Sequence, residues 1–215
     1  MEILQFFTDF ILHIDDQIQS MVQFFGNWSY VILFLIIFAE TGLIIMPFLP
    51  GDSLLFAIGA FSAPAFGELF DIRIILISLF IASVIGDSVN YWIGRKFGQK
   101  LVDNPRIPIN QEHIDQTQAF YDKNGGKTII LARFIPIIRT FAPFVAGVSH
   151  MRYKDFMLFN VVGGFVWVFG FTLLGYFLGS NDFVKEYKEV GVLAVILISF
   201  LPVFFEFIKV KFKKH

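Results

Sequence analysis

The chain has 215 residues, of which 56% are hydrophobic and only 16% are charged, and 30 of them are phenylalanine. A soluble domain carries roughly a quarter of its residues as charged side chains, so this composition excludes an ordinary soluble protein and indicates a membrane protein. The net charge of -1 gives no basis for a nucleic-acid partner, and the absence of cysteine excludes disulfides, thiolate zinc sites and cysteine nucleophiles.

The first third of the chain is acidic and largely apolar. Residues 1–26 place apolar side chains at helical spacing with acidic residues among them, which predicts an interfacial amphipathic helix; no secretory signal peptide is expected. Residues 28–66 are apolar but interrupted by proline, and we expect a first re-entrant hairpin there. Residues 72–94 are predominantly apolar and predict a transmembrane helix, which needs about 20 residues.

The basic residues predict which side each later segment faces. Residues 95–127 hold six of them and are expected to form a cytoplasmic loop and helix, and the tail after residue 208 holds four lysines. Residues 156–179 and 190–208 are predicted transmembrane helices. Both basic regions lie in the cytoplasm only if residues 128–149 enter and leave the membrane from that side. This segment is therefore predicted to be a second re-entrant hairpin.

Proline supports the two hairpins. Pro136 and Pro143 each lack a backbone donor, and we expect both to break the helix, as Pro50 and Gly51 do in the first hairpin. A common offset of 93 residues aligns Pro50 with Pro143 and also places the charge at the entrance of one hairpin over the charge at the other. The predicted fold is one all-α polytopic membrane domain over residues 1–215, an inverted repeat with two opposed re-entrant hairpins.

Five ionisable residues lie in or beside these apolar segments: Glu40, Asp52, Asp87, Arg133 and Arg139. Each costs at least about 2.5–3.5 kcal/mol in the bilayer unless it is paired or hydrated. We expect carboxylates of the first hairpin to face arginines of the second in a wet cavity. One interpretation is a permanent salt bridge, such as Glu40 with Arg133. The other is a pathway in which Arg133 and Arg139 bind a phosphate headgroup and Glu40 and Asp52 carry protons.

Further residues are expected to support this site. Asp87, Asn90 and Tyr91 lie on one helical face, which is predicted to point into the helix bundle. Two G-x-x-x-G motifs, beginning at Gly94 and Gly175, predict close helix packing more than a ligand site.

The sequence predicts no metal, no cofactor and no catalytic residue. His150 follows the second hairpin, and no second histidine stands at metal-ligand spacing. A lipid phosphatase would need a nucleophile and a base held in order, so an enzyme is the least favoured of three functions. The others are a lipid transporter and a proton-coupled exporter of small molecules or cations that contributes to membrane homeostasis.

Three blocks of the sequence resemble the signature motifs of the bacterial DedA family, part of the superfamily of VTT-domain or SNARE-associated Golgi proteins. They are residues 40–52 (ETGLIIMPFLPGD), 86–98 (GDSVNYWIGRKFG) and 133–147 (RFIPIIRTFAPFVAG). The resemblance implies a multi-pass protein of the bacterial inner membrane with two opposed re-entrant hairpins. Several members of that family move undecaprenyl phosphate or phospholipid across the bilayer, apparently with the proton-motive force.

The resemblance also implies functional residues. The essential acidic pair of the family corresponds to Glu40 and Asp52, and its essential arginine pair to Arg133 and Arg139. We therefore expect a flippase for an anionic lipid phosphate, with protons and the membrane as partners and with a cytoplasmic C-terminus. The lipid, the direction and the proton stoichiometry stay open, and so does the oligomeric state, with a homo-oligomer among the alternatives.

Overall fold

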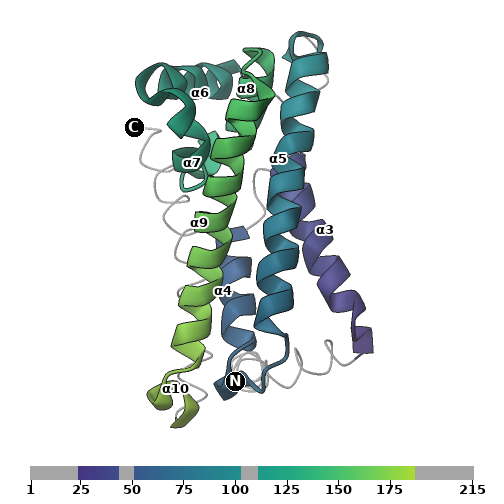
Figure 1. Cartoon of the computed structure of the whole chain (residues 1–215), viewed down its shortest axis with the longest axis vertical. Coiled ribbons are helices and arrows are strands. Elements are labelled where there is room, and N and C mark those ends of the chain that lie inside the picture. Colours follow the sequence, from purple (N-terminus) through teal and green to yellow (C-terminus); the bar gives the residue numbers. More distant parts are fainter. Residues whose placement is uncertain (1–23, 44–50, 103–110, 187–215) are drawn as a thin grey trace, which may run out of the picture. The chain divides into compact units, whose positions relative to one another are not determined.

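The computed structural model describes residues 24–43, 51–102 and 111–186, and these form helices joined by short connections without strands (Figure 1). The helices are α3 (Trp28–Gly42), α4 (Gly51–Phe61), α5 (Ile72–Val102), α6 (Gln111–Asn124), α7 (Thr128–Ala132), α8 (Pro136–Val148), α9 (Tyr153–Gly179) and α10 (Asp182–Glu186), with the 3-10 turns η1 (Pro64–Phe66) and η2 (Gly125–Lys127). The all-α class is confirmed for this part of the chain. Most of the helix predicted at residues 1–26, the span predicted at 190–208, and Pro50 lie outside the described residues.

The chain divides into two compact units, which are described separately. Unit 1 takes its described residues from 1–32, 50–76 and 170–215, and unit 2 from 33–49 and 77–169. Helices α3, α5 and α9 contribute residues to both.

Two of the described helices are long and apolar enough to cross a bilayer, over Ile72–Gly98 and Tyr153–Gly179, with 27 residues each. Such a helix measures about 40 Å, more than the roughly 30 Å of the hydrocarbon core. Only 33% of the most apolar window of each is buried, whereas the core helix of a soluble protein is mostly covered. Their exposed side chains include Ile74, Ile77, Ile81, Ile85, Leu158, Phe165, Leu174 and Phe177. Both helices therefore present apolar faces suited to lipid.

Helix α5 is longer than the span predicted at residues 72–94. It continues to Val102, through the first eight residues of the predicted cytoplasmic loop at 95–127. The reason is local, because Arg95 packs its guanidinium over the rings of Tyr91 and Trp92 and donates to the Tyr91 hydroxyl at 2.6 Å. A charged side chain that lies back along its own helix does not end that helix.

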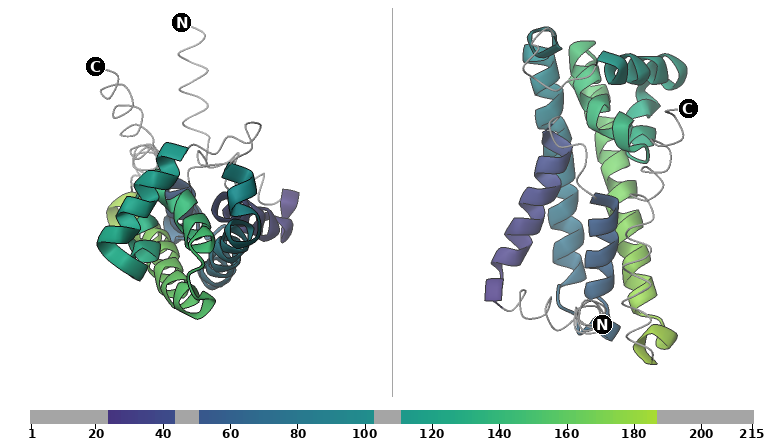
Figure 2. Two further views of the ribbon diagram at one scale, coloured as in Figure 1. Left: turned by 90° about the horizontal axis from the view of Figure 1, so that it is seen from above. Right: turned by 180° about the vertical axis from the view of Figure 1, so that it is seen from behind.

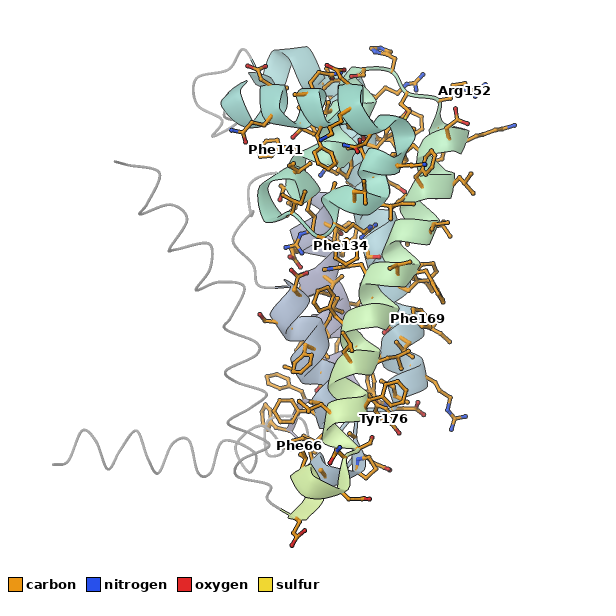
Figure 3. All side chains as sticks on the ribbon, turned by 90° about the vertical axis from the view of Figure 1, so that its left-hand side faces the viewer. Phe66, Phe134, Phe141, Arg152, Phe169 and Tyr176 are labelled. Carbon is orange, nitrogen blue, oxygen red and sulfur yellow. The ribbon has the colours of Figure 1, made fainter. Side chains whose placement is uncertain are left out.

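The segment predicted as the second hairpin is a short helix, a break and a second helix. Ile135 has extended backbone angles (φ -124°, ψ 104°) and Pro136 begins α8, as expected because proline disfavours the helical conformation in the residue before it. The last turn of α7 tightens, with Phe134 N bonded to the Leu131 carbonyl at 3.2 Å. Phe134 stands in the break and is 48% exposed (Figure 3). Pro136 thus acts as predicted.

The prediction that Pro143 also breaks the helix is wrong. Pro143 lies inside α8, which continues to Val148. Proline removes one helical hydrogen bond, but its fixed φ of about -65° is itself helical, so packing of the flanking turns can hold the helix together. Here those turns are buried through Phe141, Phe144 and Val145.

Helix α6 lies across the direction of α9 in both side views (Figures 1 and 2) and packs on α8. The Tyr121 hydroxyl donates to the Ala142 carbonyl of α8 at 2.9 Å. Burial raises the pKa of Tyr121 above its usual value, so the hydroxyl keeps the proton that it donates. Gly125, with φ +59°, follows the end of α6.

Unit 1 contains a very close crossing of α4 and α9. A Cβ added to Gly59 would collide with the Thr172 carbonyl oxygen, and one added to Gly175 would collide with that of Phe56. The two backbones therefore touch through positions that only glycine can fill.

Unit 2 contains a crossing of the same kind between α8 and α5. A Cβ added to Gly147 would collide with the Tyr91 carbonyl oxygen, and one added to Gly94 would collide with that of Phe144. In both crossings the contacting residues are three positions apart on each helix. The prediction that the motifs at Gly94 and Gly175 are packing faces is confirmed.

We predict opposite effects for alanine at two kinds of glycine. Gly94→Ala and Gly175→Ala should each lower the free energy of unfolding by about 1–3 kcal/mol, because the crossing backbones must separate. Gly170→Ala is the matched control in α9, since its Cβ would meet nothing within 4 Å. This substitution should raise the free energy of unfolding by up to about 1 kcal/mol, because alanine has a higher helix propensity than glycine. Thermal unfolding in detergent measures all three; equal unfolding temperatures would contradict the crossings.

Candidate functional site

Arg133 carries a buried ion pair in unit 2. It lies in the break between α7 and α8, and its side chain is only 2% exposed. Its Nη2 donates to Asp87 Oδ2 of α5 at 2.5 Å and to Asn160 Oδ1 of α9 at 2.6 Å. Asn160 in turn donates to the Val84 carbonyl at 3.0 Å. A buried charge is tolerated only when it is paired and hydrogen-bonded, and here both partners come from helices of spanning length.

A second buried ion pair joins α8 to α3. Arg139 Nη2 donates to Glu40 Oε1 at 2.7 Å, and the two side chains are 9% and 3% exposed. Together Glu40, Asp87, Arg133 and Arg139 make two ion pairs of zero net charge. We call these four residues the charged centre.

Asn90 positions the second ion pair. Its side-chain amide donates to the Thr41 carbonyl at 3.2 Å and to the Thr140 carbonyl at 2.9 Å. These residues directly follow Glu40 and Arg139 in the sequence. Thr41 belongs to the last turn of α3, whose carbonyls have no helical donor. Asn90 therefore ties the end of α3 to α8 beside the charges.

A close approach of α3 and α5 brings Glu40 to this place. A Cβ on Gly86 would collide with the hydroxyl of Thr41, and one on Gly42 would lie 3.3 Å from the Gly86 Cα. The absence of a side chain at Gly86 allows α3 to end against α5, next to Asp87.

One aromatic ring serves both arginines. Trp167 of α9 is fully buried, and the Cζ atoms of Arg133 and Arg139 lie 5.6 Å and 5.3 Å from its ring centroid. Both distances are within the range of cation–π interaction, which contributes about 0.5–2 kcal/mol for each contact. The charged centre is thus bordered by an indole.

The observed pairing differs from the salt bridge considered from the sequence. Glu40 pairs with Arg139 rather than with Arg133, and Arg133 pairs with Asp87. The reason is that Asn90 fixes the end of α3 against α8, while Arg133 in the break faces α5. Asp87, predicted as a supporting residue, is one of the four charges.

The other predicted site residues lie as follows. Asp52 stands in the first turn of α4 in unit 1, where a carboxylate interacts favourably with the helix dipole, and Gly51 is the buried first residue of that helix. The role of Asp52 as a proton carrier stays a prediction. Asp87, Asn90 and Tyr91 are all buried, so the prediction that this face points inward is confirmed.

Tyr91 is packed between neighbouring residues, whereas His150 lies on the surface. Tyr91 stacks on Phe156 with ring centroids 4.6 Å apart, and its hydroxyl donates to the Met151 carbonyl. His150 is exposed, with φ +54°. No three residues of metal-binding type gather in the part of the chain that the structure describes.

The chain is similar to membrane proteins from several bacteria. It is 48% identical to Protein DedA of Escherichia coli (strain K12) over 212 residues, which cover 98% of this chain and 96% of that protein. It is 42% identical over 179 residues to an uncharacterised membrane protein of Mycobacterium tuberculosis (strain ATCC 25618 / H37Rv), covering 83% and 78% of the two chains. It is 34% identical over 161 residues to Inner membrane protein YqjA of Escherichia coli (strain K12), covering 74% and 72%.

The VTT domain family matches residues 49–177. The chain belongs to the DedA family. The resemblance noted in the three sequence blocks is thereby confirmed, and the protein is a membrane protein. No solved structure matches this DedA-family chain.

Some residues around the charged centre of this DedA-family chain were missed from the sequence. Asn160, Gly163, Gly164 and Trp167 stand at positions i, i+3, i+4 and i+7 of α9 and share one face. A Cβ on Gly163 would lie 3.1 Å from Arg133 Nε, so the glycine makes room for the guanidinium. The sequence could have indicated these residues through this helical spacing, because an asparagine and a tryptophan flank two glycines within an otherwise apolar span.

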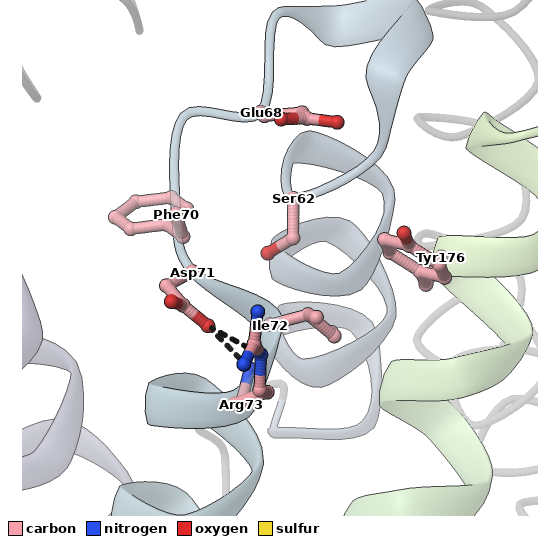
Figure 4. Close-up of a pocket in the computed structure, with 7 residues that line it drawn as sticks. All are labelled: Ser62, Glu68, Phe70, Asp71, Ile72, Arg73 and Tyr176. Carbon is pink, nitrogen blue, oxygen red and sulfur yellow. Dashed lines mark hydrogen bonds and ion pairs between the residues drawn. The ribbon is translucent and has the colours of Figure 1, made fainter.

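A hollow in unit 1 was also not predicted. It has a volume of about 320 Å³ and lies where α5 begins, with the polar side chains of Ser62, Glu68, Asp71, Arg73 and Tyr176 in its wall (Figure 4). The side chains of Arg73 and Asp71 are 88% and 46% exposed. These charges are hydrated, whereas those of the charged centre are buried. The charged centre is therefore the candidate functional site of this DedA-family protein.

Proposed function

We propose that this DedA-family protein moves an anionic lipid phosphate, either undecaprenyl phosphate or a phospholipid, across the bacterial inner membrane with proton coupling. The observation that carries the proposal is the pair of arginines in one buried site, each held by a carboxylate. Arg133 and Arg139 are the proposed headgroup ligands, and Glu40 and Asp52 the proposed proton carriers.

The ion pairs suggest how protons couple to the lipid. Each guanidinium interacts with a carboxylate, at 2.5 Å for Arg133 and 2.7 Å for Arg139. A phosphate that binds an arginine competes with that carboxylate, because both present oxygen acceptors. Once a carboxylate takes up a proton, its attraction for the arginine falls and the phosphate replaces it. The contact of Glu40 with Arg139 supports Glu40 as a proton carrier in this exchange, and Asp87 is the carboxylate that phosphate would displace from Arg133.

We propose further that the whole chain is one inverted-repeat domain with two opposed re-entrant hairpins, formed by α3 with α4 and by α7 with α8. These helices have 15, 11, 5 and 13 residues, and each is shorter than the roughly 20 residues that a crossing needs. The matching crossings of α4 with α9 and of α8 with α5 support the repeat. The basic residues of the sequence support a cytoplasmic C-terminus.

A transporter is favoured over an enzyme. The charged centre is built from two carboxylates and two arginines, which suit the binding of a phosphate group, whereas a lipid phosphatase would also need a nucleophile held beside a base. The alternative is a proton-coupled exporter of small molecules or cations, which would use the carboxylates and give the arginines no ligand.

The decisive experiment is translocation of a labelled lipid phosphate in proteoliposomes, with and without a pH gradient. The wild type should move the lipid, and faster with the gradient. Glu40→Gln, Asp52→Asn, Arg133→Gln and Arg139→Gln should each slow transport by roughly tenfold or more, since a hydrogen bond to a charged group contributes about 1.5–3 kcal/mol.

Arg152→Gln is the matched control, because Arg152 is an arginine whose side chain is 84% exposed. It should transport as the wild type does. Equal transport in the wild type and the four charge variants would make the charges structural. A change of internal pH without movement of lipid would favour the exporter.

A further inference from the structure

Trp167 occupies a place that its size alone does not explain. It is fully buried, whereas Trp28 and Trp92 are 69% and 50% exposed. Its ring lies within cation–π distance of both Arg133 and Arg139. Two guanidinium groups repel each other, and this repulsion grows in a site from which water is excluded. An indole offsets the repulsion because the negative face of its π system attracts cations, and it does so better than the ring of phenylalanine or tyrosine.

Arg133 also has donors available. Its Nη2 holds Asp87 and Asn160, but its Nε and Nη1 have no hydrogen-bond partner among the described residues, although the side chain is only 2% exposed. Buried donors are nearly always satisfied. The oxygens of a phosphate group suit such donors, because arginine offers several N–H groups in one plane.

We propose that Trp167 is a positioning residue that holds the guanidinium groups of Arg133 and Arg139 on one indole, so that a single phosphate headgroup contacts both. This inference rests on the proposed function and deepens it. Asn160 fixes Arg133 from the same face of α9, and Trp167 sets the place of the second arginine relative to the first. A residue that only filled volume could be replaced by another apolar side chain without loss of affinity.

Binding of a phosphate ligand tests this role. The probe is radiolabelled farnesyl monophosphate added to the full-length protein in detergent, with farnesol as the uncharged competitor. Trp167→Leu should raise the Kd by about tenfold or more, and Trp167→Phe, which keeps a ring, by less. Trp28→Leu removes an exposed tryptophan and should leave the Kd unchanged.

Fluorescence gives a readout that loss of packing alone does not move. The chain has three tryptophans, so Trp28→Phe combined with Trp92→Phe leaves Trp167 as the only source of tryptophan emission. Farnesyl monophosphate should shift its emission saturably, with the Kd found by binding, because the cations beside the indole change partner. Farnesol should cause no shift, and neither should the phosphate when Arg139→Gln is added.

The outcomes separate the two proposals. If the wild type binds the phosphate and Trp167→Leu binds it equally tightly, or if the emission of Trp167 does not respond, the positioning role is wrong while the proposed function stands. If the wild type neither binds nor moves a lipid phosphate, both proposals fail. Folding is checked in each variant by its unfolding temperature. Trp167→Phe decides the question where Trp167→Leu does not fold, because its Kd should still exceed that of the wild type.

Discussion

Arg133→Gln is expected to abolish lipid-phosphate transport and to lower the free energy of unfolding by about 3–5 kcal/mol. The large effect arises because the substitution leaves Asp87 as a buried carboxylate without its cation. Asp87→Asn should destabilise to a similar extent, since it leaves Arg133 as a buried cation. Unfolding in detergent and transport in proteoliposomes measure the two effects separately.

The double variant, Asp87→Asn with Arg133→Gln, separates structure from function. It removes both charges and leaves amides of similar size, so the unfolding free energy should return to within about 1–2 kcal/mol of the wild type. Transport should stay absent, because no guanidinium remains at this position to bind phosphate. If the double variant transports the lipid at the wild-type rate, the ion pair is structural and Arg133 is not a headgroup ligand.

The composition of the charged centre could be predicted from the sequence because the free energy of a buried charge is a local property. A glutamate or arginine inside an apolar segment requires a partner wherever the segment lies. Five residues were identified in this way. Glu40, Asp87, Arg133 and Arg139 are paired in the charged centre, whereas Asp52, predicted to act with Glu40, stands in the first turn of α4.

The pairing could not be predicted, because it depends on how helices far apart in the sequence approach one another. Glu40 and Arg139 are joined across 99 positions. Their register is fixed by Gly86, which lets α3 end against α5, and by Asn90, which bonds α3 and α8. A sequence alignment of one hairpin over the other contains neither constraint.

Pro143 and Trp167 illustrate two other limits. The loss of one backbone donor at Pro143 is a local fact, but whether a helix breaks there depends on the packing of its neighbours, which holds α8 together. In the sequence alone, Trp167 cannot be distinguished from the other apolar residues of its span. Its importance lies in two guanidiniums that reach it from another part of the chain.

Reversing the charges of the second ion pair should be as damaging as removing those of the first. Arg139→Glu would place a second carboxylate beside Glu40, where the arginine now stands 2.7 Å away. Like charges about 4 Å apart repel by about 4 kcal/mol at an effective dielectric constant of about 20, so the variant should unfold at a markedly lower temperature and transport nothing. Glu40→Arg should behave in the same way, with two guanidiniums in place of two carboxylates.

Exchanging the two residues tests whether the pair only holds the fold together. Glu40→Arg combined with Arg139→Glu restores one cation and one anion, and the unfolding temperature should recover most of the loss caused by either single change. Transport should not recover, because the guanidinium would then project from α3 rather than from α8, where Arg139 shares the Trp167 ring with Arg133. Recovery of both stability and transport would contradict the headgroup role. A salt bridge that only stabilises the fold should work equally well whichever of the two helices carries the arginine. Recovery of stability alone is the result expected of a substrate-binding arginine.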